Sequence, residues 1–198
     1  HITNNDLKSK DTTYGNWQCG SGLIEIYLFK MLMKSLSDCI PNELEREKHI
    51  WENQIYMSDI DPLQISFAKE NISRVCRTKN LKLNITEQDC FKNALKTTYT
   101  IGSIDFKTTN AFVPYYRKLS DHVIVITQSN SHRYVEQRLN EIYAYQFLGR
   151  AKNATPMCII HIDKNKTSKD VVFIDGDQLV TKTNPKTVPT GDFLGWQY

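Results

Sequence analysis

The sequence contains no apolar run that approaches the ~18 residues needed to span a membrane, and its first residues do not resemble a secretion signal. Its five cysteines are scattered, and none of them is in C-x-x-C spacing. This pattern argues against a zinc site and a disulfide framework, and it favours a reducing compartment. Basic and acidic residues nearly balance, 25 against 22, so charge alone does not indicate a nucleic-acid partner. We therefore expect a cytoplasmic protein with no bound metal and no membrane contact.

Glycine is also scarce, with eight in 198 residues, and two of the eight stand close together in Asn16-Trp-Gln-Cys-Gly-Ser-Gly22. A β-rich run leads into this stretch, and an apolar helical pattern follows it. The stretch therefore predicts a strand, a tight glycine turn and a helix. Glycines let a ligand approach the backbone, and a helix N-terminus offers free N–H groups. An ordinary strand-to-helix turn is the alternative interpretation.

Acidic residues follow the next two predicted strands. Ile55-Tyr-Met-Ser-Asp-Ile-Asp-Pro62 predicts a short strand ending in an acid, and Asp89 comes shortly after a third apolar stretch. In nucleotide-binding folds, an acid at the end of the second strand binds ribose hydroxyls. The alternative role for Asp59 is a helix N-cap, but Asp61, directly before Pro62, suits that role better.

Short β-rich runs alternate with longer helical patterns, which predicts an α/β fold with a mostly parallel sheet and helices on both faces. The predicted strands are 14–18, 55–58, 81–85, 101–106, 123–127, 142–147 and 157–162. The predicted helices are 21–36, 63–76, 110–118 and 131–140. The last two strands favour a hairpin that ends in an antiparallel edge strand. A charged helical stretch at 43–52 predicts a solvated face.

The glycine and acid clusters resemble motifs of S-adenosylmethionine-dependent DNA adenine-N6 methyltransferases of restriction-modification systems. Asn16 to Gly22 resembles their D-P-x-C-G-S-G motif, with Asn16 at the usual Asp position. Tyr56-Met-Ser-Asp-Ile-Asp-Pro62 is similar to their Y-G-x-D-I-D-P. Asp89-Cys-Phe91 resembles the acid that approaches the cofactor's adenine. His1-Ile-Thr3 is similar to a short H-x-T segment that touches the cofactor's methionine end.

This resemblance covers roughly residues 1–162 and implies a Rossmann-like class I methyltransferase fold. It also implies S-adenosylmethionine as cofactor, double-stranded DNA as partner, and the cytoplasm of a bacterial or phage-infected cell. The expected methyltransferase domain is 1–162. Residues 163–198 differ in composition, and Asp175-Gly-Asp177 is a hairpin signal. We expect there a small β appendage or the start of a DNA-recognition region.

The resemblance assigns roles within the cofactor site. Gly20 and Gly22 would admit the methionine portion, and Asp59 would accept hydrogen bonds from both ribose hydroxyls. Asp89 would accept from the adenine amino group, with Ile60 or Phe91 packing on the ring. The full set of expected cofactor-binding residues is Thr3, Asn16, Gln18, Cys19, Gly20, Gly22, Asp59, Ile60, Asp89, Cys90 and Phe91. Within it we expect Cys19 and Cys90 to act through packing, and Phe91 fits a core position equally well.

One motif of the resembled family is missing. These enzymes carry [N/D/S]-P-P-[Y/F] after the fourth strand, where a polar group holds the target amino group and the aromatic ring stacks on the flipped base. Here the corresponding stretch is Lys107-Thr-Thr-Asn-Ala-Phe-Val-Pro-Tyr-Tyr116. Asn110, Pro114 and Tyr115 are the right residue types, but they are too far apart, and a helix running into the next strand explains them better. No catalytic residue can therefore be assigned from the sequence.

Several alternatives stay open. The protein is either an inactive relative that binds cofactor or DNA, or an active enzyme whose natural chain includes a segment absent from this sequence. A Rossmann-type oxidoreductase is disfavoured, because Glu25 stands where G-x-G-x-x-G requires a third glycine. RNA or protein as the methylated substrate is not excluded.

Overall fold

The computed structural model describes residues 2–89, 92, 95–104, 114–128, 142–150, 156–167 and 172–175. The chain divides into two compact units, Ile2–Gly102 and the residues from Ser103 onward. The predicted boundary between 1–162 and 163–198 stays a prediction.

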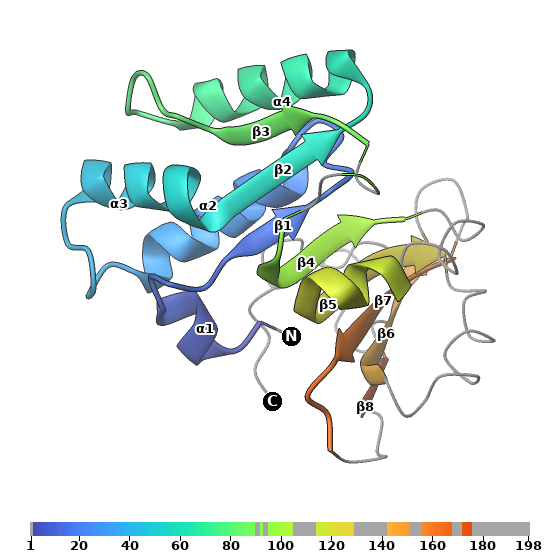
Figure 1. The fold of residues 1–198 in the computed structure, drawn as a ribbon. Helices are drawn as coiled ribbons and strands as arrows, with labels where there is room; N and C mark the ends of the chain where they lie inside the picture. Colours follow the sequence, from blue (N-terminus) through green and yellow to red (C-terminus); the bar gives the residue numbers. More distant parts are fainter. Residues whose placement is uncertain are drawn as a thin grey trace. The chain divides into compact units, whose positions relative to one another are not determined.

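The N-terminal unit is a parallel sheet with helical connections (Figure 1). Its elements are α1 (Asn4–Lys8), β1 (Tyr14–Asn16), α2 (Leu23–Ser35), α3 (Glu43–His49), the π-helical turn η1 (Ile50–Gln54), β2 (Ile55–Asp59), α4 (Pro62–Val75), β3 (Asn84–Glu87) and β4 (Thr97–Ser103). Within this unit the strands lie in the order β3-β2-β1-β4, and each neighbouring pair is parallel. The four parallel strands that the sequence predicts here are confirmed.

Two of these strands begin at other residues than the pattern indicates. β3 starts three residues late, at Asn84, whose side-chain amide donates to the carbonyl oxygens of Glu52 and Ile55 at 2.9 and 3.4 Å. β4 starts four residues early, at Thr97, because its threonine-rich beginning is buried although it is polar. Both shifts come from contacts with distant segments, which a local apolar pattern does not report.

Two aromatic pairs lie in the otherwise largely aliphatic core of this unit. Phe29 on α2 stacks on Trp51 with 5.0 Å between ring centroids, and Tyr14 stacks on Tyr99 at 5.6 Å. The turn η1 follows α3 without a break and buries Trp51 completely. Burial of such large rings removes much apolar surface from water, and it fixes α2 and α3 against the sheet that carries the glycine turn.

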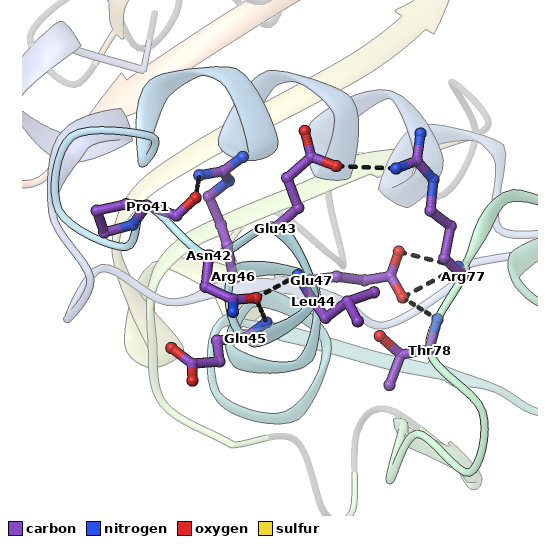
Figure 2. A network of polar contacts seen from close by, with 9 residues as sticks. All are labelled: Pro41, Asn42, Glu43, Leu44, Glu45, Arg46, Glu47, Arg77 and Thr78. Carbon is purple, nitrogen blue, oxygen red and sulfur yellow. Dashed lines mark hydrogen bonds and ion pairs between the residues drawn. The ribbon is translucent and has the colours of Figure 1, made fainter.

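The predicted solvated face at 43–52 is present on one side of α3, where Glu43, Glu45 and Lys48 are exposed, but the other side is buried. Glu47 is only 3% exposed, and its carboxylate accepts the backbone N–H groups of Arg77 (3.1 Å to each oxygen) and Thr78 (2.5 Å) (Figure 2). Asn42 caps the start of α3 by accepting the N–H groups of Leu44 and Glu45. The buried acid therefore ties α3 to the chain just after α4.

We expect Glu47→Gln to lower the free energy of unfolding by about 2 kcal/mol, since an amide cannot accept all of these backbone donors and loses the charge. Urea unfolding followed by circular dichroism measures this change. Glu45→Gln is the matched control, because Glu45 lies on the exposed face of the same helix, and a shift within about 0.5 kcal/mol is expected there. Equal losses in the two variants would contradict the assigned role of Glu47.

The C-terminal unit is organised around an antiparallel strand. A helical turn at 114–119 leads into β5 (Ser120–Gln128), and β6 (Ile142–Arg150), β7 (Pro156–Asp163) and β8 (Val172–Asp175) follow. β7 is antiparallel to β5 on one side and to β6 on the other, and β8 pairs parallel with β6. The predicted hairpin and its antiparallel strand are confirmed, but β7 is not an edge strand, because β6 and β8 lie beyond it in the order β5-β7-β6-β8. The predicted helix at 131–140 and the second half of the hairpin around Asp175 lie outside the described residues.

No helix within the described ranges is long and apolar enough to cross a membrane. In the same part of the chain, no group of three or more His, Cys, Asp and Glu side chains is arranged to hold a metal ion.

Candidate functional site

Polar residues lie at or just after the ends of three neighbouring parallel strands. β1 ends at Asn16, β2 at Asp59, and β3 at Glu87, two residues before Asp89. Asp59 is in register with Glu87, and the N–H of Gln88 donates to the Asp59 carbonyl at 3.0 Å. Because the carboxyl ends of parallel strands meet at one edge of a sheet, these residues line a common edge, the usual ligand position in open α/β sheets.

The glycine turn lies at this edge and is fixed to β2. The N–H of Cys19 donates to the carbonyl of Ser58 at 3.0 Å, and the N–H of Gly20 donates to Oδ2 of Asp59 at 2.9 Å. Gly20 and Gly22 both have positive φ, at 52° and 77°, a backbone region that costs other residues energy. The sequence expectation that the ribose acid and the glycine turn lie together is therefore met by a direct hydrogen bond.

Helix α2 begins at Leu23, and its N-cap residue, Gly22, has no side chain to cap it. No capping side chain accepts from the first N–H groups of α2, although that of Glu25 bonds its own carboxylate, and the helix dipole at this edge favours a negatively charged or polar ligand group. Gly22 also packs against α4, since a Cβ built on it would lie 3.1 Å from the Cβ of Ala68. This close approach allows the helix start to sit directly beside the turn.

Asp59 accepts hydrogen bonds with both carboxylate oxygens, one from the glycine turn and one from the start of the segment that leads into α4. Oδ2 accepts from Gly20, and Oδ1 accepts the N–H of Asp61 at 3.0 Å. Each carboxylate oxygen can accept more than one hydrogen bond, and the side chain is partly exposed, so capacity remains for ligand hydroxyls. Asp61 is the N-cap of α4, accepting from Leu63 N at 2.9 Å, with Pro62 next in the chain, as the sequence predicts.

Asn16 and Glu25 form a buried pair that sequence reasoning missed. The side-chain amide of Asn16 donates to Oε1 of Glu25 at 2.6 Å, while Oδ1 of Asn16 accepts the N–H of Gln18 at 3.1 Å. Glu25 is 2% exposed, and its Oε2 has no hydrogen-bond partner. Burial raises the pKa of this carboxyl to about 7, although hydrogen bonds from the backbone and Asn16 oppose the shift. The signal in the sequence was an acid inside an apolar helical run.

Five further residues expected at the cofactor differ in their exposure to solvent or lie outside the described ranges. Ile60 is 72% exposed beside Asp59, and Asp89 is partly exposed after β3, so both side chains are open to solvent at the site edge. Cys19 is buried, and burial raises the pKa of its thiol to about 12, so it packs rather than reacts, as expected. Cys90 and Phe91 lie outside the described residues.

Thr3 has a local structural role. Its hydroxyl oxygen accepts the N–H of Asp6 at 3.1 Å, which makes Thr3 the N-cap of α1. Asp6 in turn accepts from the hydroxyl of Tyr99 at 2.6 Å. These bonds fix α1 near the start of β1, whereas the glycine turn follows its end. The role of Thr3 in cofactor binding stays a prediction without a supporting contact.

The stretch that would carry the catalytic motif is only partly described. Residues 105–113, including Asn110, lie outside the described ranges. Pro114 and Tyr115 are in the helical turn that leads into β5, which agrees with the helix interpretation of these two residues.

No protein-family model and no curated protein matches the sequence. Solved structures do match the fold. The methyltransferase subunit of a type I restriction-modification system from Streptococcus thermophilus has a TM-score of 0.63 at 10% identity, covering 96% of this chain and 48% of that one. The M protein of the type I restriction enzyme EcoKI gives 0.63 at 9% identity, with 96% and 44% covered. Magnesium protoporphyrin IX methyltransferase from Synechocystis, solved with S-adenosylmethionine bound, gives 0.53 at 12% identity, with 77% and 70% covered.

The chain spans about half the length of the two restriction-modification proteins. At these identities the likeness shows the fold, and the predicted class I methyltransferase fold is confirmed. The fold of this chain therefore agrees with the one that the sequence motifs imply.

Proposed function

We propose that this chain is the cofactor-binding domain of an S-adenosylmethionine-dependent DNA methyltransferase that modifies N6 of adenine. The observation that carries the proposal is the 2.9 Å hydrogen bond from Gly20 N to Asp59 Oδ2, which joins the two most specific motifs in one site. In this proposal the enzyme works in the cytoplasm of a bacterial or phage-infected cell, with double-stranded DNA as its partner.

The residues present fit the cofactor. Gly20 and Gly22 keep the turn free of side chains, and the uncapped start of α2 leaves donors for a carboxylate. Asp59 offers carboxylate oxygens to a ribose, and the exposed face of Ile60 offers apolar surface to an adenine ring. Asp89 follows the adjoining strand and suits the adenine amino group.

When bound, the cofactor supplies a methyl group on a sulfonium that is already a good leaving group. The residues of this chain then have to hold that methyl group in the orientation that leads to transfer, which is catalysis by positioning. Asp59 fixes the ribose end and the glycine turn at once, because it binds both. Asn16, held between Gln18 and Glu25, fixes the end of β1 at the same edge.

The choice of DNA adenine rests on the motif resemblance and on two structural neighbours that are restriction-modification methyltransferase proteins. A second candidate is a non-catalytic module that binds the cofactor or DNA. The absence of any [N/D/S]-P-P-[Y/F] tetrapeptide from the sequence favours it.

A labelled-methyl transfer assay on duplex DNA tests this proposal, with N6-methyladenine as the product measured. We expect no transfer by this chain alone, because nothing in its sequence is placed to hold a flipped adenine amino group, and the few kcal/mol spent on base flipping are not recovered. The intact natural protein should transfer the methyl group. Transfer by the chain alone would contradict our interpretation of the missing motif. Cofactor binding without transfer by the intact protein would favour the non-catalytic module.

A further inference from the structure

Glu25 occupies an unusual position for an acid. It stands in the first turn of α2, three residues after Gly22, and its carboxyl is 2% exposed. Oε1 has one side-chain partner, the amide of Asn16, and Oε2 has no hydrogen-bond partner. Burying a carboxylate in this way is costly, because the group loses its hydration and regains only part of the hydrogen bonding that water supplied.

The groups that face Glu25 are neutral hydrogen-bond donors: its own backbone N–H in the first turn of α2 and the amide of Asn16, which both favour the ionised form in part. From β1 it meets the neutral Asn16, and no basic side chain of the described residues forms an ion pair with it. From the turn it faces Cys19, whose pKa is raised first by burial and then by the charges of Glu25 and Asp59. The residues around the glycine turn thus include two acids, Glu25 and Asp59, and no cation of the described residues is paired with Glu25.

Asn16 stands where the resembled motif has an acid, and Glu25 supplies a carboxyl 2.6 Å away. A carboxyl group from α2 therefore lies beside the position of the family's acid, held there by the amide of Asn16. Gly102 allows β4 to lie close to the Asn16 side chain, since a Cβ at this position would be 3.3 Å from Oδ1 of Asn16.

Resting on the proposed function, we propose that Glu25 senses the charge of the cofactor's sulfur: its carboxyl releases a proton to solvent when the sulfonium form binds, and it keeps the proton when the sulfur is neutral. S-adenosylmethionine bears the sulfonium, and S-adenosylhomocysteine, which has lost the methyl group and that charge, does not. Glu25 is then a positioning residue that favours the methyl donor over the spent product.

The sign of the pH effect follows from linkage. The ligand-free carboxyl has a raised pKa of about 7, and an ionised form favoured by the sulfonium makes binding release a proton. Affinity for S-adenosylmethionine should therefore rise about tenfold between about pH 6 and about pH 8, and affinity for S-adenosylhomocysteine should stay nearly flat. Near pH 6, calorimetry in two buffers of different ionisation enthalpy should detect about one proton released per S-adenosylmethionine.

The test is calorimetric titration of both ligands across this pH range with the chain and its variants. Glu25→Gln should lose the pH dependence and the proton release that distinguish the two ligands, while the cofactor's own amino group titrates alike in both proteins. Asn16→Asp combined with Glu25→Gln should restore the preference, since one acid returns to the same corner. Glu70→Gln, which alters an exposed acid on α4, is the control and should keep the wild-type profile. Circular dichroism confirms that each variant is folded.

Equal pH profiles for the two ligands in the wild-type chain, or an unchanged profile in folded Glu25→Gln, would overturn the role of Glu25 and leave cofactor binding intact. Failure of the wild-type chain to bind either ligand at any pH would instead overturn the proposed function, and this inference with it.

Discussion

Replacing Asp59 by alanine should weaken S-adenosylmethionine binding roughly ten- to hundredfold. The ribose loses a charge-assisted acceptor worth about 1.5–3 kcal/mol. The turn also loses the bond from Gly20 N to the same carboxylate, so the donors at the start of α2 are less well ordered. Isothermal titration calorimetry with the wild-type chain and the variant measures the change in affinity directly.

Asp61→Ala is the matched control for that experiment. Asp61 lies two residues further on and caps α4 through Leu63 N, so its loss should cost about 1 kcal/mol of stability and leave affinity nearly unchanged. Asp59→Asn separates charge from geometry, because asparagine keeps one acceptor oxygen and loses the charge. Unchanged affinity in Asp59→Ala would remove the basis of the proposed site.

Replacing Gly22 by valine should destabilise the N-terminal unit by roughly 3 kcal/mol or more. A left-handed backbone costs a residue with a side chain about 1–2 kcal/mol, and φ is 77° here. The new Cβ would lie 3.1 and 3.3 Å from the Cβ and Cα of Ala68, and overpacking of this kind adds about 1–3 kcal/mol. Urea unfolding monitored by circular dichroism gives the loss.

Gly20→Ala provides the comparison, because it has the same backbone constraint without the crowding. Its φ is 52°, but a Cβ there meets only Oε1 of Gln64, at 3.8 Å. We expect a loss of about 1–2 kcal/mol from the backbone alone. Equal losses in Gly20→Ala and Gly22→Val would show that the contact between Gly22 and Ala68 does not matter.

Much of the fold could be predicted from local sequence signals. The glycine turn, the acid that ends β2 and the Asp61-Pro62 helix start are each read from a few adjacent residues, because turns and caps depend on local backbone chemistry. Once these signals are placed in order, a parallel sheet with its ligand edge at the strand ends follows. The hydrogen bond between Gly20 and Asp59 forms because the glycine turn and the acid follow neighbouring strands of that sheet.

Features that depend on distant partners could not be predicted. Glu47 accepts hydrogen bonds from a segment 30 residues further along, and nothing near it in the sequence indicates burial. Glu25 is likewise explained only by Asn16, nine residues earlier, on a strand that folds against its helix. A motif of three residues predicts that Thr3 contacts the cofactor, which stays a prediction, but it does not indicate that Thr3 caps a short helix by bonding Asp6. In each case the partner, rather than the residue, decides the role.

Calorimetric titration of the wild-type chain with S-adenosylmethionine tests the central claim most directly, with S-adenosylhomocysteine as competitor and a nicotinamide dinucleotide as the alternative ligand. The structure predicts saturable binding of S-adenosylmethionine at one site, displacement by S-adenosylhomocysteine, and no binding of the dinucleotide, since the turn lacks a third glycine and has Glu25 in its place. Binding of the dinucleotide, or no heat of binding with S-adenosylmethionine, would contradict the account.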